Sequence, residues 1–135
     1  MRRAVCAVVV LALAGCGGSS RPKSRAVTLP GYGGFAAQTI TGAYSAPECA
    51  KDVRSFAREG LLLVAHVGAA AAYPADLYYM DLRIPFADFV ARGCDPADLG
   101  RALERRMTPR QRQTLAGNLP SAMAQLVRDG LRHAN

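Results

Sequence analysis

The chain has 135 residues, half of them hydrophobic, and a formal net charge of +7 at pH 7. This length suits one domain with a modest core and excludes two domains of ordinary size. The excess of positive charge favours anionic partners such as acidic lipid head groups, anionic polymers or nucleic acid.

The first 16 residues have the order of features that is typical of an exported chain. Arg2 and Arg3 precede the apolar block 4–12, which is shorter than the about 20 residues that a membrane span needs. Small residues then lead to Cys16 in the stretch LAGC. We therefore expect residues 1–15 to be a signal peptide, whose removal leaves 120 residues and lowers the net charge from +7 to +5.

The stretch from Leu13 to Cys16 resembles the lipobox of bacterial lipoproteins, in which the cysteine thiol receives a diacylglycerol. The resemblance implies that Cys16 is the lipidation site and that its acyl chains together anchor the protein in a cell-envelope membrane. Gly17, in place of an aspartate, implies the outer membrane where the host has one. The alternative is an ordinary secretory signal with an incidental cysteine. Because we expect the protein to be exported, we do not expect nucleic acid among its partners.

Cys49 and Cys94 are the two thiols that remain after processing, because Cys6 leaves with the signal and Cys16 is acylated. An even pair in an oxidising compartment predicts a disulfide. Closing that loop stabilises the fold by about 4 kcal/mol in the chain-entropy model. A metal pair is the alternative, but the chain has no CxxC motif and its histidines stand at no ligand spacing. We therefore expect no metal and no other cofactor.

Residues 16–30 are rich in Gly, Ser, Pro and positive charge, which predicts a lipidated, flexible tether. Its basic residues would either touch anionic lipid or act as a solvated spacer. The single helical domain is expected over residues 31–135. It opens with a loop-like segment, 31–44, that has room for one short strand around Gln38 to Thr41.

The first helix is expected from about Ala46, because Ser45 and Glu48 have the spacing of a capping box. Its apolar stripe predicts a buried face, with Asp52 among the charged residues on the other faces. Gly60 either ends this helix or only weakens it.

The segment GLLLVAHVGAAAAY, residues 60–73, is the most apolar part of the mature chain, so periodicity does not decide its state. Four consecutive alanines favour a helix, whereas Leu61 to Val67 taken alone fits a buried strand. We predict a helix that Pro74 ends, followed by a connection up to Pro85.

Proline marks three helix starts in the second half of the chain. Asp95 precedes Pro96 as an N-cap, and Thr108 and Gln111 form a second capping box. Together these signals predict an all-α domain of four to five helices. The later helices are expected from Pro85 to Arg92, closed by Gly93, from Pro96 through Met107, from Pro109 to about Gly117, and from about Pro120 onward.

Catalytic candidates are few. The chain has no GxSxG motif, His66 lies inside the apolar segment, and His133 lies two residues before the last one given. Asp76, Asp81 and Asp88 surround two tyrosines and are candidates for the paired acids of a glycosidase, although spacing alone does not bring them together. No residue is assigned a catalytic role.

Two clusters are candidate partner-binding surfaces. The densest positive stretch predicts a broad charged face on a helix, which is either solvated or bound to an anionic partner. Five aromatic residues fall within 17 positions, 73–89, and form either core or a recognition surface. The candidate residues are Arg101, Arg105, Arg106, Arg110 and Arg112 in the positive stretch, and Tyr78 and Tyr79 in the aromatic one.

These observations predict a lipid-anchored cell-envelope protein, in the periplasm or at the cell surface, that acts as a binding or assembly module. Its partners would be anionic lipid or another envelope protein. The alternative is an envelope enzyme or accessory subunit acting on cell-wall or lipid substrate, with His66 or an Asp76 and Asp81 pair in a pocket lined by tyrosines. A third reading is a domain that plugs into a larger machine through an exposed apolar patch.

Overall fold

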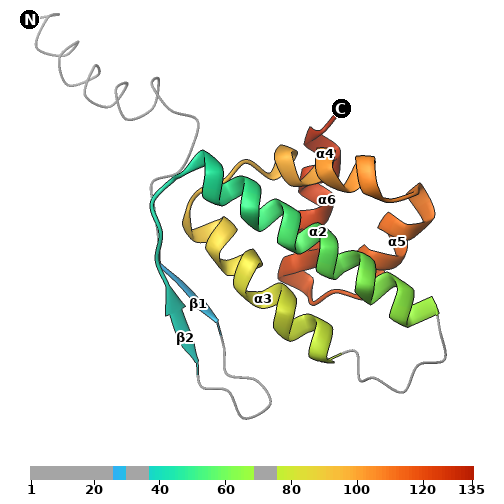
Figure 1. The fold of residues 1–135 in the computed structure, drawn as a ribbon, viewed down its shortest axis with the longest axis horizontal. Helices are drawn as coiled ribbons and strands as arrows, with labels where there is room; N and C mark the ends of the chain where they lie inside the picture. The colour runs from blue at the N-terminus through green and yellow to red at the C-terminus, as the bar shows by residue number, and fades with distance from the viewer. Residues whose placement is uncertain (1–25, 30–36, 69–75) are drawn as a thin grey trace, which may run out of the picture.

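The computed structural model of the protein describes residues 26–29, 37–68 and 76–135. This part of the chain forms five helices and one two-stranded hairpin (Figure 1), which confirms the predicted all-α domain. The predicted signal peptide and Cys16 lie outside the described residues. The elements are β1 (Val27–Leu29), β2 (Gln38–Ile40), α2 (Ala46–Gly68), α3 (Asp76–Ala91), α4 (Pro96–Arg106), α5 (Pro109–Gly117) and α6 (Ser121–His133).

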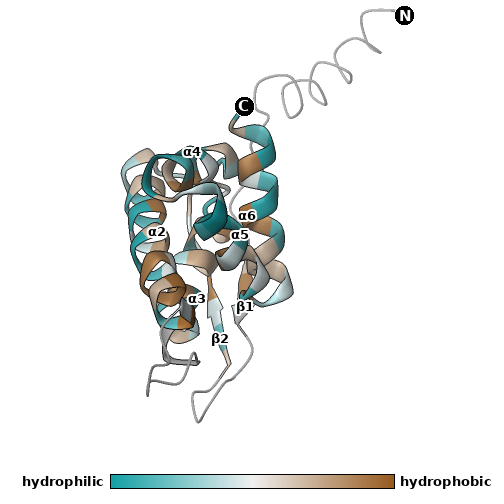
Figure 2. Cartoon of the chain, turned by 90° about the vertical axis from the view of Figure 1, so that its right-hand side faces the viewer, coloured by the Kyte–Doolittle hydropathy of each residue, from teal (hydrophilic) through white to brown (hydrophobic). Residues whose placement is uncertain are grey.

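Helix α2 is the centre of the arrangement, since it packs against α3, α4 and α5, while α4 also packs against α6 (Figure 1). Hydropathy alternates around the helices in Figure 2, as expected of helices that bury one face. One core results, because the buried side chains of all five helices meet in it. Its largest fully buried side chains are Leu63, Leu82, Leu99, Leu103, Leu115 and Val127.

The contact between α4 and α6 depends on two glycines. A Cβ added to Gly100 would lie 2.0 Å from the carbonyl oxygen of Gly130, and one added to Gly130 would lie 2.5 Å from the carbonyl oxygen of Pro96. The two backbones therefore touch directly, which any larger residue at either position would prevent.

The predicted disulfide is present. Cys49, in the first turn of α2, is bonded to Cys94, just before α4, with a Cα–Cα distance of 5.7 Å. Gly93 has a φ of 67° and ends α3, with the N–H groups of Gly93 and Cys94 donating to the carbonyls of Val90 and Phe89. The bond thus ties the start of α2 to the turn between α3 and α4.

The predicted caps of α4 and α5 are confirmed. The Asp95 carboxylate accepts a hydrogen bond from the N–H of Ala97 at 3.0 Å, and Pro96 opens α4. Thr108 and Gln111 make both bonds of a capping box at the start of α5. At the start of α2, Ser45 Oγ accepts from the N–H of Glu48 at 3.4 Å.

Gly60 does not end the first helix. Helix α2 continues through Leu61 to Val67, which settles this segment as helix rather than strand. A Cβ on Gly60 would lie 3.3 Å from the methyl groups of Leu115 in α5. The glycine therefore makes room for a neighbouring helix, a role that is visible only once the helices are packed.

The prediction that Pro85 opens a helix is wrong, and so is the predicted connection over residues 76–84. Pro85 lies inside α3, which begins at Asp76. A proline costs an interior helix about 3 kcal/mol through its lost hydrogen bond and its ring clash. Leu82 and Phe89, one turn before and after it, are both buried in the core. This packing offsets the cost.

The short hairpin lies against α3 (Figure 1). Strand β2 confirms the strand expected around Gln38, while its partner β1 falls within the segment predicted as tether. Val27 pairs with Ile40 and Leu29 with Gln38 in antiparallel register. Three residues carry too little periodicity to reveal β1 in the sequence.

Candidate functional site

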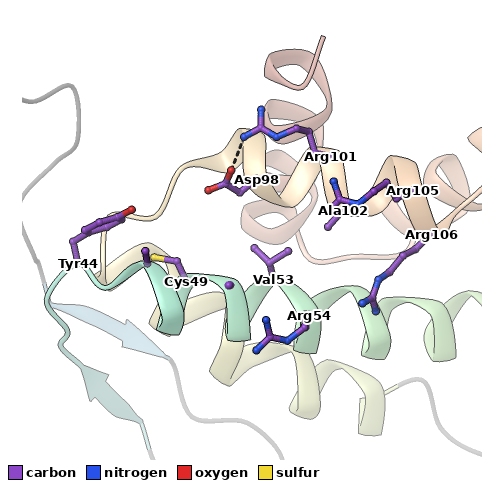
Figure 3. A pocket seen from close by; sticks show the side chains of 11 residues that line it. Tyr44, Cys49, Val53, Arg54, Asp98, Arg101, Ala102, Arg105 and Arg106 are labelled. Atoms are coloured by element: carbon purple, nitrogen blue, oxygen red, sulfur yellow. Dashed lines mark hydrogen bonds and ion pairs between the residues drawn. The ribbon is translucent and has the colours of Figure 1, made fainter.

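A groove of about 560 Å³ lies between α2 and α4 (Figure 3). Its floor consists of small or apolar residues, and its rim carries four arginines, one from α2 and three from α4. Tyr44 lies at one end. We call this cleft the arginine groove; it is lined by Tyr44, Ala46, Cys49, Ala50, Val53, Arg54, Asp98, Arg101, Ala102, Arg105 and Arg106.

The helical repeat explains how α4 builds this rim. Leu99 and Leu103 are buried in the core, so Arg101 and Arg105, one turn apart, fall on the opposite, exposed side. In Figure 3, Arg106 reaches from α4 toward α2, Arg105 lies along the groove, and Arg101 turns toward Asp98. The α2 side adds Arg54, which follows the buried Val53.

The groove has a large excess of positive charge. Asp98 is the one acid that lines it, and its carboxylate accepts a hydrogen bond from Arg101 Nη2 at 2.5 Å. Among the described residues no ion pair involves Arg54, Arg105 or Arg106, although all three are exposed. Four arginines and one aspartate leave a net charge of +3 on the lining. Guanidinium groups bind carboxylate and phosphate oxygens in a two-pronged geometry, so the groove is suited to an anion.

The structure divides the predicted arginine face. Arg101, Arg105 and Arg106 lie together at the groove, whereas Arg110 and Arg112 belong to α5 and do not line it. Arg112 Nη1 donates to the carbonyl oxygen of Met107 at 2.7 Å, just after the end of α4. The positive charge of Arg112 therefore lies at the C-terminal end of α4, where it interacts favourably with the helix dipole.

Arg54 was missed by sequence reasoning. It is 47 positions from Arg101 in the chain, and only the packing of α2 against α4 joins them. The sequence signal that could have identified Arg54 is its position directly after Val53. This position lies beside the apolar stripe of α2 that contacts α4.

The aromatic cluster contributes to the fold where it is described. Tyr79 is half-buried and its hydroxyl donates to the carbonyl oxygen of Asn118 at 2.5 Å, which joins α3 to the end of α5. Phe86 and Phe89 pack in or against the core. Tyr73 and the side chain of Tyr78 lie outside the described residues.

A second charged cluster lies on the other side of α2, where it meets α3. Asp52 lies on a face of α2 other than the apolar stripe, as expected, but that face is also buried, since only 7% of Asp52 is exposed. Asp52 hydrogen-bonds to Asp88 of α3, and Asp88 accepts a hydrogen bond from Arg92 Nε at 2.7 Å. The apolar stripe marks one buried face of α2, but the helix packs between α3 and α4 and buries a second. We call Asp52 and Asp88 the acid pair.

The acid pair holds one proton between two carboxyl groups. Burial raises the pKa of Asp52 to about 8, and the hydrogen bond and negative charge of Asp88 act in the same direction. Burial also opposes ionisation of Asp88, but hydrogen bonds from Asp52 and Arg92 and the charge of Arg92 outweigh it and lower its pKa. At neutral pH a protonated Asp52 therefore donates to an ionised Asp88.

The geometry of the acid pair differs from that of a glycosidase. The two carboxyl groups are close enough for a hydrogen bond between them to shift the pKa of both, whereas a retaining glycosidase holds its acids about 5 Å apart around the sugar bond. Arg92 Nη1 instead donates to the carbonyl oxygen of Ala43 at 3.0 Å, in the segment that leads into α2. The cluster thus holds this segment against α3 and serves the fold.

The other catalytic candidates line neither of the two cavities described. His66 is half-buried near the end of α2, Asp81 is exposed on α3, and His133 is exposed at the end of α6. None of them lines the arginine groove or the cavity of about 350 Å³ beside the acid pair. The Asp76 side chain is not among the described ones. Within ranges 26–29, 37–68 and 76–135 no three metal-ligating side chains form a group.

No helix in the described part of the chain is both long and apolar enough to cross a membrane. Comparison with known proteins finds no family model, no curated protein and no solved structure that matches the chain. We therefore infer function from the residues of the groove.

Proposed function

We propose that this protein is a lipid-anchored cell-envelope protein that acts as a binding module, with the arginine groove as its site for an anionic group. The observation that carries the proposal is the presence of three exposed arginines, Arg54, Arg105 and Arg106, that line one groove without an acidic partner among the described residues. The lipobox-like stretch ending at Cys16 supports the location.

The groove is shaped before any ligand arrives. Its volume of about 560 Å³ is within the range of small-ligand sites. Its floor includes Cys49, whose disulfide to Cys94 joins α2 to the start of α4. A lining held in place in this way loses less entropy on binding.

Binding is tested with inorganic pyrophosphate as the probe. The protein is the expected mature chain, residues 16–135 with Cys16→Ser; removal of residues 1–15 breaks none of the described contacts. We expect saturable binding that added NaCl weakens. The double variant R105Q/R106Q should bind about tenfold more weakly, since charge-assisted hydrogen bonds are worth at least that factor.

The matched control is R110Q/R128Q, which removes the same charge from exposed positions outside the groove. Its affinity should stay within about twofold of the unmodified protein. Equal losses in both double variants would show that pyrophosphate responds to net charge, and the groove would lose its assigned role.

The anchor is tested separately by the intact mass of the protein extracted from membranes. We expect the loss of residues 1–15 and the added mass of acyl chains on Cys16. A membrane-free protein that retains its first 15 residues would overturn the assignment to the envelope.

A further inference from the structure

The arginine groove lies at the end of the domain that the tether reaches first. Ten residues separate Cys16 from Val27, Val27 pairs with Ile40, and four further positions lead to Tyr44 at the groove's edge. Fully extended, this path spans at most about 60 Å. With Cys16 acylated, the edge of the groove therefore stays within about 60 Å of one membrane surface.

The lining of the groove is amphiphilic. Guanidinium groups occupy its rim, whereas Ala50, Val53 and Ala102 form part of an apolar floor. A polyanion without an apolar part would contact only the guanidinium groups of the rim. A phospholipid presents a phosphate and, joined to it through the esterified glycerol, apolar acyl chains, so it matches both parts.

The residues between Cys16 and Val27 carry the same positive charge as the groove. Arg21, Lys23 and Arg25 lie between Cys16 and Val27 with no acidic residue among them. Basic residues held near an anionic leaflet are attracted to it. Anchoring also raises the effective concentration of lipid at the groove, so a weak site is sufficient.

We infer that the arginine groove binds the phosphate head group of an anionic phospholipid in the same membrane that holds Cys16. This inference rests on the proposed function and names the ligand of its site. The domain is then attached at two points, the acylated cysteine and the groove. Two-point attachment orients the α2 and α4 face toward the bilayer, which an acyl anchor alone does not do.

The test uses the mature chain with Cys16→Ser, so that the anchor does not dominate binding. Vesicles of phosphatidylcholine are compared with vesicles that also contain phosphatidylglycerol. Because the chain contains no tryptophan, Tyr44→Trp supplies a single reporter at the groove's edge. Brominated acyl chains on phosphatidylglycerol quench that reporter only if the groove lies against the bilayer.

We expect binding to the anionic vesicles alone, with quenching of Trp at position 44. Binding should weaken about tenfold in R105Q/R106Q and by no more than about twofold in R110Q/R128Q, since attraction to the leaflet is strongest for charges near its surface. All four arginines are exposed, so the variants should fold alike, which circular dichroism checks.

Equal vesicle binding by both double variants, or an unquenched reporter, would overturn the inference and assign the attraction to the tether. Should pyrophosphate binding still depend on Arg105 and Arg106 in that case, the proposed function stands with a soluble anion as ligand. If neither probe depends on them, both proposals fall.

Discussion

Helix α2 carries a charged cluster on each of two sides, and only one of the two clusters compensates its charge within the protein. The acid pair is buried against α3, where a shared proton and Arg92 compensate the carboxylates. The arginine groove is exposed to solvent where α2 meets α4, and three of its four arginines have no acidic partner among the described residues.

This difference separates a structural role from a binding role. A buried charge must be paired within the protein, because desolvation is costly. An exposed charge is stabilised by water and remains available to a ligand. Groups with perturbed pKa values are often sought as functional sites, but in this protein the carboxyl group with the raised pKa belongs to the fold, whereas exposed guanidinium groups form the candidate site.

Removal of the disulfide should have the largest effect, because the bond between Cys49 and Cys94 ties the start of α2 to the turn before α4. The variant C49S/C94S is expected to lose about 4 kcal/mol of unfolding free energy in urea denaturation, which is the chain-entropy cost of freeing the loop. Pyrophosphate binding to any folded fraction should weaken as well. An unchanged urea midpoint would show that packing alone holds α2 to the start of α4.

The next largest effect should follow from Arg92→Met, which leaves the ionised Asp88 without its cation and removes the bond to Ala43. We expect a loss of about 2 kcal/mol in unfolding free energy. The control is Arg101→Met, because its partner Asp98 has a side chain 50% exposed, against 18% for Asp88. The control should change stability by less than about 1 kcal/mol. Similar losses in both would remove the contrast between buried and exposed pairs.

The acid pair should also make stability depend on pH. Asp52 stays protonated up to about pH 8 in the folded protein, whereas its ordinary pKa is 3.8. Unfolding therefore releases a proton between these values, and the unfolding free energy falls as the pH rises from about 4 to about 8. The lowered pKa of Asp88 acts only below this range, where it removes stability as the pH falls.

Asp52→Asn tests this dependence, because an amide donates to Asp88 without titrating. The decline between about pH 4 and pH 8 should flatten in the variant. At pH 9 the variant should be more stable than the unmodified protein, by on the order of 2 kcal/mol. Parallel stability curves for the two proteins would mean that Asp52 ionises normally.

The smallest effect on stability is expected at the groove. R105Q/R106Q should change the unfolding free energy by less than about 0.5 kcal/mol, with any change toward higher stability because like charges are removed. Its effect should fall on anion binding instead. A loss of stability similar to that of Arg92→Met would assign these arginines to the fold.

The sequence alone was sufficient for features that neighbouring residues decide. The capping residues Asp95 and Thr108 satisfy backbone groups within their own first turn, so their spacing marks the start of each helix. The pairing of Cys49 and Cys94 follows from their number and from the expected export. The apolar repeat likewise predicts the core face of α4.

Tertiary structure decided the features that depend on which surfaces meet. Pro85 stays inside α3 because Leu82 and Phe89 are held in a core that also includes other helices. Asp52 is buried because α3 covers the side of α2 that the apolar stripe does not mark, and Arg54 joins α4's arginines because α2 crosses beside them. Caps and periodicity report local energetics, whereas burial, pKa and the membership of a groove depend on contacts between residues that are far apart in the chain.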